Sequence, residues 1–180
     1  MEVVISASLT TLILLGMAYV VTFAGRVETT VGLQSDTNQA ASKALAHMTE
    51  DVREAVRVTI NSSTDFTIYY PTVDASTGHY NLTEPNYNYW IEYYVGGSDG
   101  SKNPTGTYLW RTSSSGGNPL KITNNLTDFS AGYFPVGATT SIRLTLQVTE
   151  TSRGFSGKKL TGNTLMSQRV LYLRNYFASF

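Results

Sequence analysis

The stretch VVISASLTTLILLGMAYVVTFAG, residues 3–25, decides how the rest of the chain is interpreted. It holds no charged residue, follows Glu2 and precedes Arg26. At about 1.5 Å per residue, a helix of this length covers roughly 35 Å, which is enough for a hydrocarbon core of about 30 Å. We therefore predict a membrane-spanning helix here.

Glu2 is the only acid at the head of this uncharged run. A carboxylate in hydrocarbon costs several kcal/mol unless it is neutralised or paired, so an acid in this place indicates a function. Its natural partner is an ammonium group, and the nearest candidates are the chain's own amino terminus at Met1 and that of a neighbouring copy. The alternative interpretation is an acid that rests at the membrane interface.

The apolar start does not match a secretory signal. Such signals carry a basic n-region, an apolar stretch of about 7–15 residues and a small-residue cleavage site. Here an acid stands where Lys or Arg is expected, and the apolar run is longer and leads directly into an amphipathic pattern. We expect the segment to be retained.

Composition limits the remaining possibilities. With 180 residues and 41% hydrophobic content, the chain can hold one membrane helix and one modest globular domain. Thirteen basic and thirteen acidic residues cancel, which disfavours nucleic acid as the main partner. The chain has no cysteine, which excludes disulfides, iron–sulfur clusters and thiolate zinc sites.

Beyond Arg26 the apolar residues recur at steps of three and four, as on one face of a helix. They are Ala41, Ala44, Leu45, Met48, Val52, Ala55 and Val56. The charged residues between them, including Asp51, are interpreted as a solvated surface. No proline precedes Pro71, so we predict one helix from the amino terminus to about Val58, with Gly16, Gly25 and Gly32 as its weak points and 61–63 as its stop.

The sequence after residue 63 is rich in Thr, Tyr, Val and Ile, which favours strands. In Ser141–Val148 apolar and polar residues alternate, as on a strand with one buried face. We predict an α+β fold in which the long N-terminal helix packs on an antiparallel sheet, and 96–106 and 113–119 as flexible loops. The predicted strands are 66–70, 87–95, 108–112, 120–123, 141–149 and 165–174. The predicted division is 1–25 for the hydrophobic helix, 26–60 for its amphipathic continuation and 61–180 for a β-rich head.

These features together resemble the type IV pilins and the pilin-like pseudopilins. The resemblance rests on an acid followed by a long apolar helix (MEVVISASLTTLILLGMAYVV), an amphipathic continuation, a small β-rich head and the ending RVLYLRNY. In that family the acid is usually the fifth residue of the mature chain, whereas here it is the second. Either the chain begins three residues inside the usual mature start or the subunit is processed differently.

The resemblance implies a structural subunit of an extracellular, surface filament, a homopolymer that rests in the bacterial inner membrane before assembly. It also implies a prepilin peptidase and a pilus assembly platform as partners, methylation, and roles in adhesion or motility. Many apolar helices can bury one another, and each buried acid must then meet a buried amine in register. The expected assembly interface comprises Glu2, Met1, Val3, Val4, Ile5, Leu9, Leu12, Ile13, Leu14, Leu15, Gly16, Val20 and Val21.

Two alternative functions stay open. A minor pseudopilin would use the same helix in a short tip complex for secretion or DNA uptake. A monomeric membrane-anchored domain could instead bind glycans through the tyrosine-rich strand YNYWIEYY, residues 87–94. Alternating aromatic residues on a half-buried strand favour a structural role for this strand over a ligand platform.

Catalysis finds little support in the sequence. His47 and His79 lie in no recognisable nucleophile, metal or acid–base constellation, so we predict no enzyme, no cofactor and no catalytic residue. Asp99 and nearby carbonyl groups lack EF-hand spacing, and we predict no metal site. Asn61, Asn81 and Asn125 fit the N-x-S/T acceptor pattern and are weak glycosylation candidates.

Overall fold

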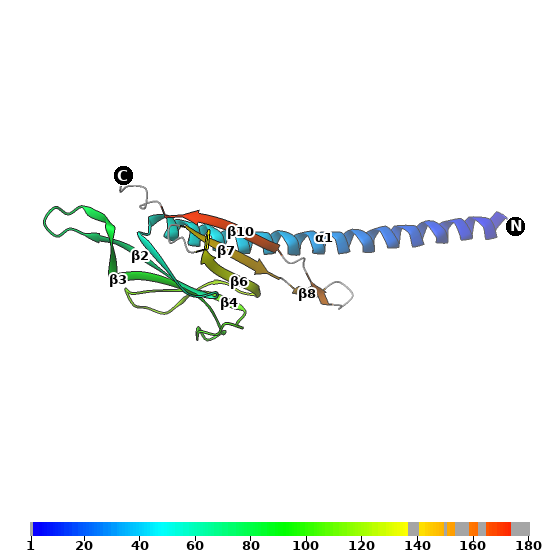
Figure 1. Cartoon of the computed structure of the whole chain (residues 1–180). Coiled ribbons are helices and arrows are strands. Elements are labelled where there is room, and N and C mark those ends of the chain that lie inside the picture. Colours follow the sequence, from blue (N-terminus) through cyan, green and yellow to red (C-terminus); the bar gives the residue numbers. More distant parts are fainter. Residues whose placement is uncertain (1, 137–140, 150, 154–158, 162–164, 174–180) are drawn as a thin grey trace. The chain divides into compact units, whose positions relative to one another are not determined.

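A computed structural model describes residues 2–136, 141–149, 151–153, 159–161 and 165–173, and the chain has an α+β fold (Figure 1). The helix α1 runs over Glu2–Glu54. The described strands are β1 (Arg57–Ser62), β2 (Asp65–Val73), β3 (Tyr80–Gly96), β4 (Tyr108–Ser113), β5 (Leu120–Thr123), β6 (Leu126–Tyr133), β7 (Ser141–Val148), β8 (Thr151–Arg153), β9 (Lys159–Thr161) and β10 (Leu165–Tyr172).

The chain divides into two compact units. The first holds residues 1–36, which include the apolar half of α1, together with 150–163, which include the antiparallel pair β8 and β9. The second unit, called the head below, holds residues 37–149 and 164–180. The head contains the last turns of α1 and the other eight strands.

Two antiparallel sheets form the head. The five-stranded sheet has the order β1-β2-β3-β4-β5, so each strand pairs with the next one along the chain. The three-stranded sheet has the order β10-β7-β6, with β7 in the centre. This is the antiparallel meander expected from the short polar connections, with the exception of β10, which returns to pair with β7.

The core lies where the amphipathic part of α1 packs on both sheets. Ala41, Ala44, Leu45, Met48, Val52 and Ala55 are buried in one cluster with strand residues such as Phe66 and Leu146. The predicted helical face is therefore confirmed as far as Val52, whereas Ala55, which is buried, and Val56, which is half-buried, follow the helix.

The alternation predicted in β7 is confirmed for its apolar residues. Ile142, Leu144, Leu146 and Val148 are fully buried, whereas Arg143 is half-buried. Thr145 departs from the pattern because it is also buried. A central strand flanked by β6 and β10 leaves less room for solvent on its second face.

The end of α1 corrects the sequence prediction. The helix stops at Glu54, and not at Val58, so the predicted helical segment 26–60 is too long. The amide of Val56 instead donates to the Tyr69 carbonyl at 3.0 Å, and Val58 pairs with Ile68 in the ladder of β1 and β2. Pairing with β2 thus recruits a β-branched stretch that the sequence pattern assigned to the helix.

Other bounds also differ from prediction. The strands β6, β8 and β9 were not predicted, and β3 begins at Tyr80, well before the predicted residue 87. The predicted strand 165–174 corresponds to β10, and its last residue lies outside the described residues.

The loop 96–106, expected to be flexible, is held by hydrogen bonds to its carbonyl groups. Trp110 Nε1 donates to the Gly97 carbonyl at 2.9 Å, and Tyr94 Oη donates to the Gly100 carbonyl at 2.8 Å. Gly106 fits there because a methyl group in its place would overlap the Gly96 carbonyl.

Candidate functional site

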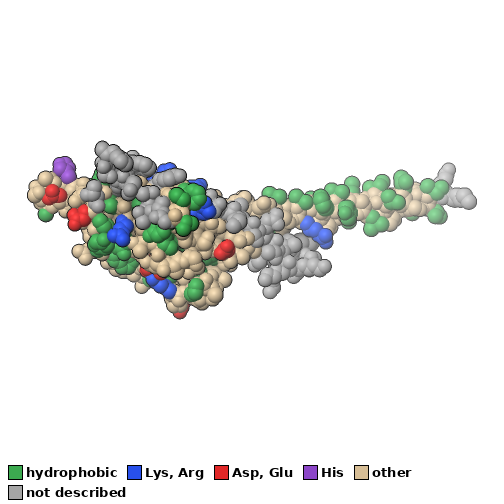
Figure 2. Space-filling view, viewed as in Figure 1, with side chains coloured by type: hydrophobic (Ala, Val, Ile, Leu, Met, Phe, Trp, Pro, Cys, Tyr) green, Lys and Arg blue, Asp and Glu red, His purple; other side chains and the backbone are tan. Residues whose placement is uncertain are grey.

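The first candidate surface is the apolar half of α1, which none of the residues that the structure describes covers. The large apolar side chains from Val3 to Phe23 are 52–80% exposed (Figure 2). Burying one Val, Leu or Ile side chain stabilises by about 1.5–3 kcal/mol, so a surface with so many of them is unfavourable in water. The helix is long and apolar enough to cross a membrane, which makes it compatible with membrane anchoring.

The predicted interface residues lie along this exposed helical surface. Of that set, the exposed large side chains are Val3, Val4, Ile5, Leu9, Leu12, Ile13, Leu14, Leu15, Val20 and Val21. A Cβ added at Gly16 would meet no atom within 4 Å apart from its chain neighbours and the nearby backbone of α1. Met1 lies outside the described residues, and of Glu2, the first residue of α1, the structure describes only the backbone. The pairing of Glu2 therefore stays a prediction.

Hydroxyl groups in this surface are satisfied by the helix itself. Thr10 Oγ1 donates to the Ser6 carbonyl and Thr11 Oγ1 to the Ala7 carbonyl, both at 2.8 Å. Thr22 Oγ1 donates to the Ala18 carbonyl at 2.7 Å. A polar group in an apolar surrounding is costly unless it is hydrogen-bonded, and these threonines meet that condition without a partner helix.

A second candidate site lies in the head around Asp51, near the end of α1. Its Oδ2 accepts from Arg111 Nε at 2.9 Å and from Tyr93 Oη at 2.6 Å, and its Oδ1 accepts from Tyr70 Oη at 3.1 Å. The Asp51 side chain is 15% exposed. The prediction that Asp51 belongs to a solvated surface is wrong, because strands β2, β3 and β4 each bring it a donor.

The electrostatics of this Asp51 cluster keep both tyrosines neutral. Burial raises the pKa of Tyr93 well above its ordinary value, and the negative charge of Asp51 raises it further. Burial and Asp51 act on the pKa of Tyr70 in the same direction. Burial lowers the pKa of Arg111, but its hydrogen bond and attraction to Asp51 outweigh this and raise it. The cluster therefore combines one carboxylate, one guanidinium and two phenols that act as donors.

A cleft of about 1000 Å³ opens beside the cluster. Asp51, Tyr70 and Arg111 line it together with residues of the β2–β3 hairpin, such as Tyr80 and Tyr89. The tyrosine-rich strand is thus divided: Tyr93 and Tyr94 are buried, as a structural role requires, whereas Tyr87 and Tyr89 are at least half exposed.

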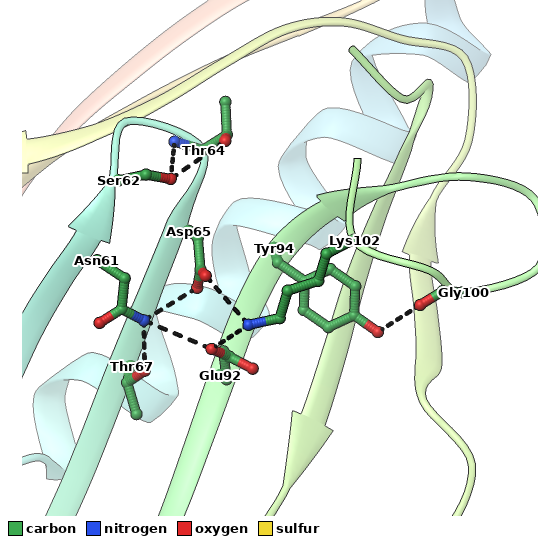
Figure 3. Close-up of polar contacts among 9 residues, drawn as sticks. All are labelled: Asn61, Ser62, Thr64, Asp65, Thr67, Glu92, Tyr94, Gly100 and Lys102. Atoms are coloured by element: carbon green, nitrogen blue, oxygen red, sulfur yellow. Dashed lines mark hydrogen bonds and ion pairs between the residues drawn. The ribbon is translucent and has the colours of Figure 1, made fainter. Parts of the chain in front are cut away.

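A third polar group joins β1, β2, β3 and the loop after β3 (Figure 3). Lys102 Nζ lies 2.6 Å from Glu92 Oε1 and 3.1 Å from Asp65 Oδ2, and Asn61 Nδ2 donates to Thr67 Oγ1 at 2.9 Å. One ammonium thus neutralises part of the charge of two neighbouring carboxylates. Burial raises the pKa of Glu92, and the charge of Asp65 adds to this. Through Lys102, this group joins the loop after β3 to Asp65 of β2 and Glu92 of β3.

The remaining predicted positions are dispersed over the chain. Asn61 belongs to the group just described, Asn81 Nδ2 donates to Glu84 Oε2 at 3.2 Å, and Asn125 has a positive φ of 54°. His47 is exposed on α1 and His79 near the tip of the β2–β3 hairpin. Asp99 Oδ1 accepts from Ser101 Oγ at 2.7 Å and from the Ser101 amide at 3.1 Å. These two hydrogen bonds lower the pKa of Asp99.

No group of three metal-ligating His, Cys, Asp or Glu side chains occurs among the described residues. No protein-family model, curated protein or solved structure matches the chain. The long apolar helix and the antiparallel sheet on which it packs are consistent with a pilin-like fold.

Proposed function

We propose that this chain is a structural subunit of an extracellular type IV pilus-like filament, which rests in the inner membrane through α1 before assembly. The observation that carries the proposal is the contrast within one helix. Its second half packs a buried face on the sheets of the head, whereas its first half exposes large apolar side chains all along its length. Such a helix requires lipid or other copies of itself as its surrounding.

Polymerisation accounts for the acid as well as for the apolar surface. A single helix that only anchors the chain in lipid does not need an acid at position 2, because a carboxylate there raises the free energy of insertion. In a bundle of copies, Glu2 can pair with a buried amine of a neighbour and thereby set the register between subunits. A prepilin peptidase and an assembly platform are the partners that this function requires.

The test replaces the acid in cells that produce the fibres. We expect Glu2→Ala to leave the head folded and the chain inserted in the membrane but to lower the yield of sheared surface filaments at least tenfold. An unpaired buried amine costs several kcal/mol, and each 1.4 kcal/mol corresponds to a factor of ten. Glu2→Asp should give an intermediate yield, since its carboxylate is about one bond, or roughly 1.5 Å, short.

Glu28→Ala is the matched control, because Glu28 is an exposed acid on the same helix outside the uncharged run. Its filament yield should equal that of the unaltered chain. Filament yield that is unchanged in Glu2→Ala would contradict the proposed role of Glu2.

A further inference from the structure

The head cleft beside Asp51 has a fixed polar floor and exposed aromatic walls. We propose that this cleft binds an uncharged oligosaccharide. The inference goes beyond filament assembly, because the described residues that line the cleft belong to the head and not to the apolar half of α1.

The floor of the cleft is preorganised by the Asp51 cluster. Asp51 accepts hydrogen bonds from Tyr70, Tyr93 and Arg111 and so fixes the direction of each donor. These bonds engage Nε and one terminal nitrogen of Arg111, whose side chain stays 28% exposed. A guanidinium has five N–H donors, so Arg111 retains donors for the hydroxyl oxygens of a ligand.

The aromatic side chains that line the cleft belong to the hairpin of β2 and β3, whose ribbon is seen in Figure 1. Tyr80 is 67% exposed and Tyr89 is 50% exposed, although both line the cleft. The Tyr89 ring lies 5.1 Å from the Tyr70 ring, centroid to centroid, with a tilt of 45°, which supports it from the floor. A pyranose ring has an apolar C–H face and polar edges, and an aromatic ring beside hydrogen-bonding groups complements both.

The charges of the cleft select an uncharged ligand. Among the described lining residues, the acids Asp51 and Glu54 balance the basic residues Arg53 and Arg111. A net charge of zero gives neither an anion nor a cation a general attraction, and the ionic floor disfavours a wholly apolar ligand. A ligand with many hydroxyl groups can accept from the arginines and donate to Glu54.

The size of the cleft indicates more than one sugar unit. Its volume of about 1000 Å³ is at the upper end of the range of about 300–1000 Å³ that is usual for small-ligand sites. A short oligosaccharide that crosses both tyrosines fits this volume better than a single hexose.

The experiment uses the full chain in detergent micelles. It is titrated by calorimetry with cellotetraose, maltotetraose, chitotetraose and mannotetraose, and with tetragalacturonate as the acidic comparison. We expect saturable binding of at least one neutral tetrasaccharide, and at least tenfold weaker binding in Tyr80→Ala and Tyr89→Ala. Both side chains are at least half exposed, and an unchanged near-ultraviolet circular dichroism spectrum checks that each variant folds.

Tyr87→Ala is the matched control. Tyr87 is also an exposed tyrosine of β3, but it contacts Tyr69 and Arg57 and does not line the cleft. The Tyr87→Ala variant should therefore bind the neutral tetrasaccharide with unchanged affinity. The proposal is overturned if no neutral tetrasaccharide binds saturably, if Tyr89→Ala binds as well as the unaltered chain, or if tetragalacturonate binds most tightly. Because the measurement needs no fibres, its outcome is independent of filament formation.

Discussion

At the scale of single residues, the polar interior of the head depends on Asp51. Its partners Tyr93 and Arg111 lie 42 and 60 residues away in sequence. The sequence pattern around Asp51 is that of an exposed helical surface. Nothing in the neighbouring sequence indicates that side chains from three strands donate hydrogen bonds to Asp51. Such sites are the least predictable from sequence, because they depend on how distant elements meet.

Removing the charge of Asp51 should destabilise the head. In Asp51→Asn the hydrogen bonds from Arg111 and Tyr93 lose their ionic acceptor and Arg111 keeps an unpaired charge. Because the pair is partly exposed, we expect a loss of about 2–3 kcal/mol, below the roughly 3–5 kcal/mol for a fully buried pair. Chemical denaturation followed by tryptophan fluorescence measures it, since Trp90 and Trp110 both belong to the head. Glu50→Gln, at an exposed neighbouring position, should leave stability unchanged.

The tyrosines of the Asp51 cluster should resist ionisation. Because the folded-state pKa values of Tyr70 and Tyr93 lie above the ordinary 10.0, the folded head holds these protons more tightly than the unfolded chain. The contribution of these two tyrosines to the stability of the head should therefore be fully present below about pH 10 and be lost as the pH rises further. In a spectrophotometric titration, Tyr70 and Tyr93 should ionise only as the head unfolds. Ionisation of all tyrosines in one step near pH 10 with the head intact would refute this.

At the scale of elements, two sequence periodicities correctly predicted which faces of α1 and β7 are buried. The three- and four-residue spacing around Leu45 and Met48 predicted the buried face of α1, and the alternation in β7 predicted its buried side chains. Both patterns depend only on the geometry of the element itself. The strand β1 could not be predicted in the same way, because its sequence continues the helical pattern and its conformation is set by pairing with β2.

The two halves of α1 should respond differently to the same substitution. Met48 is fully buried in the core, so Met48→Ala should lower the free energy of unfolding of the head by about 2–5 kcal/mol. Met17 is 63% exposed on the same helix, and Met17→Ala should leave that free energy within about 0.5 kcal/mol of the original. Denaturation of both variants in detergent micelles provides the comparison. Equal losses would mean that the apolar half of α1 is part of the cooperative core of the head.

At the scale of the whole molecule, the chain combines a folded head with a helix whose apolar half needs an apolar surrounding. The sequence predicted the long apolar N-terminal helix and the antiparallel sheets that follow it, because an uncharged run of this length leaves few alternatives in water. What surrounds the helix cannot be deduced from one chain, since lipid and neighbouring copies offer the same apolar environment. We propose that neighbouring copies of the chain finally surround the apolar half of α1.

Electron cryo-microscopy of fibres sheared from the cell surface tests this claim most directly. We predict a helical polymer of this chain in which the α1 segments, with Leu9 and Leu12 identified by their side-chain density, pack on one another at the centre and the heads lie outside. Fibres that do not contain this chain, together with its recovery only as single copies in the membrane, would contradict polymerisation.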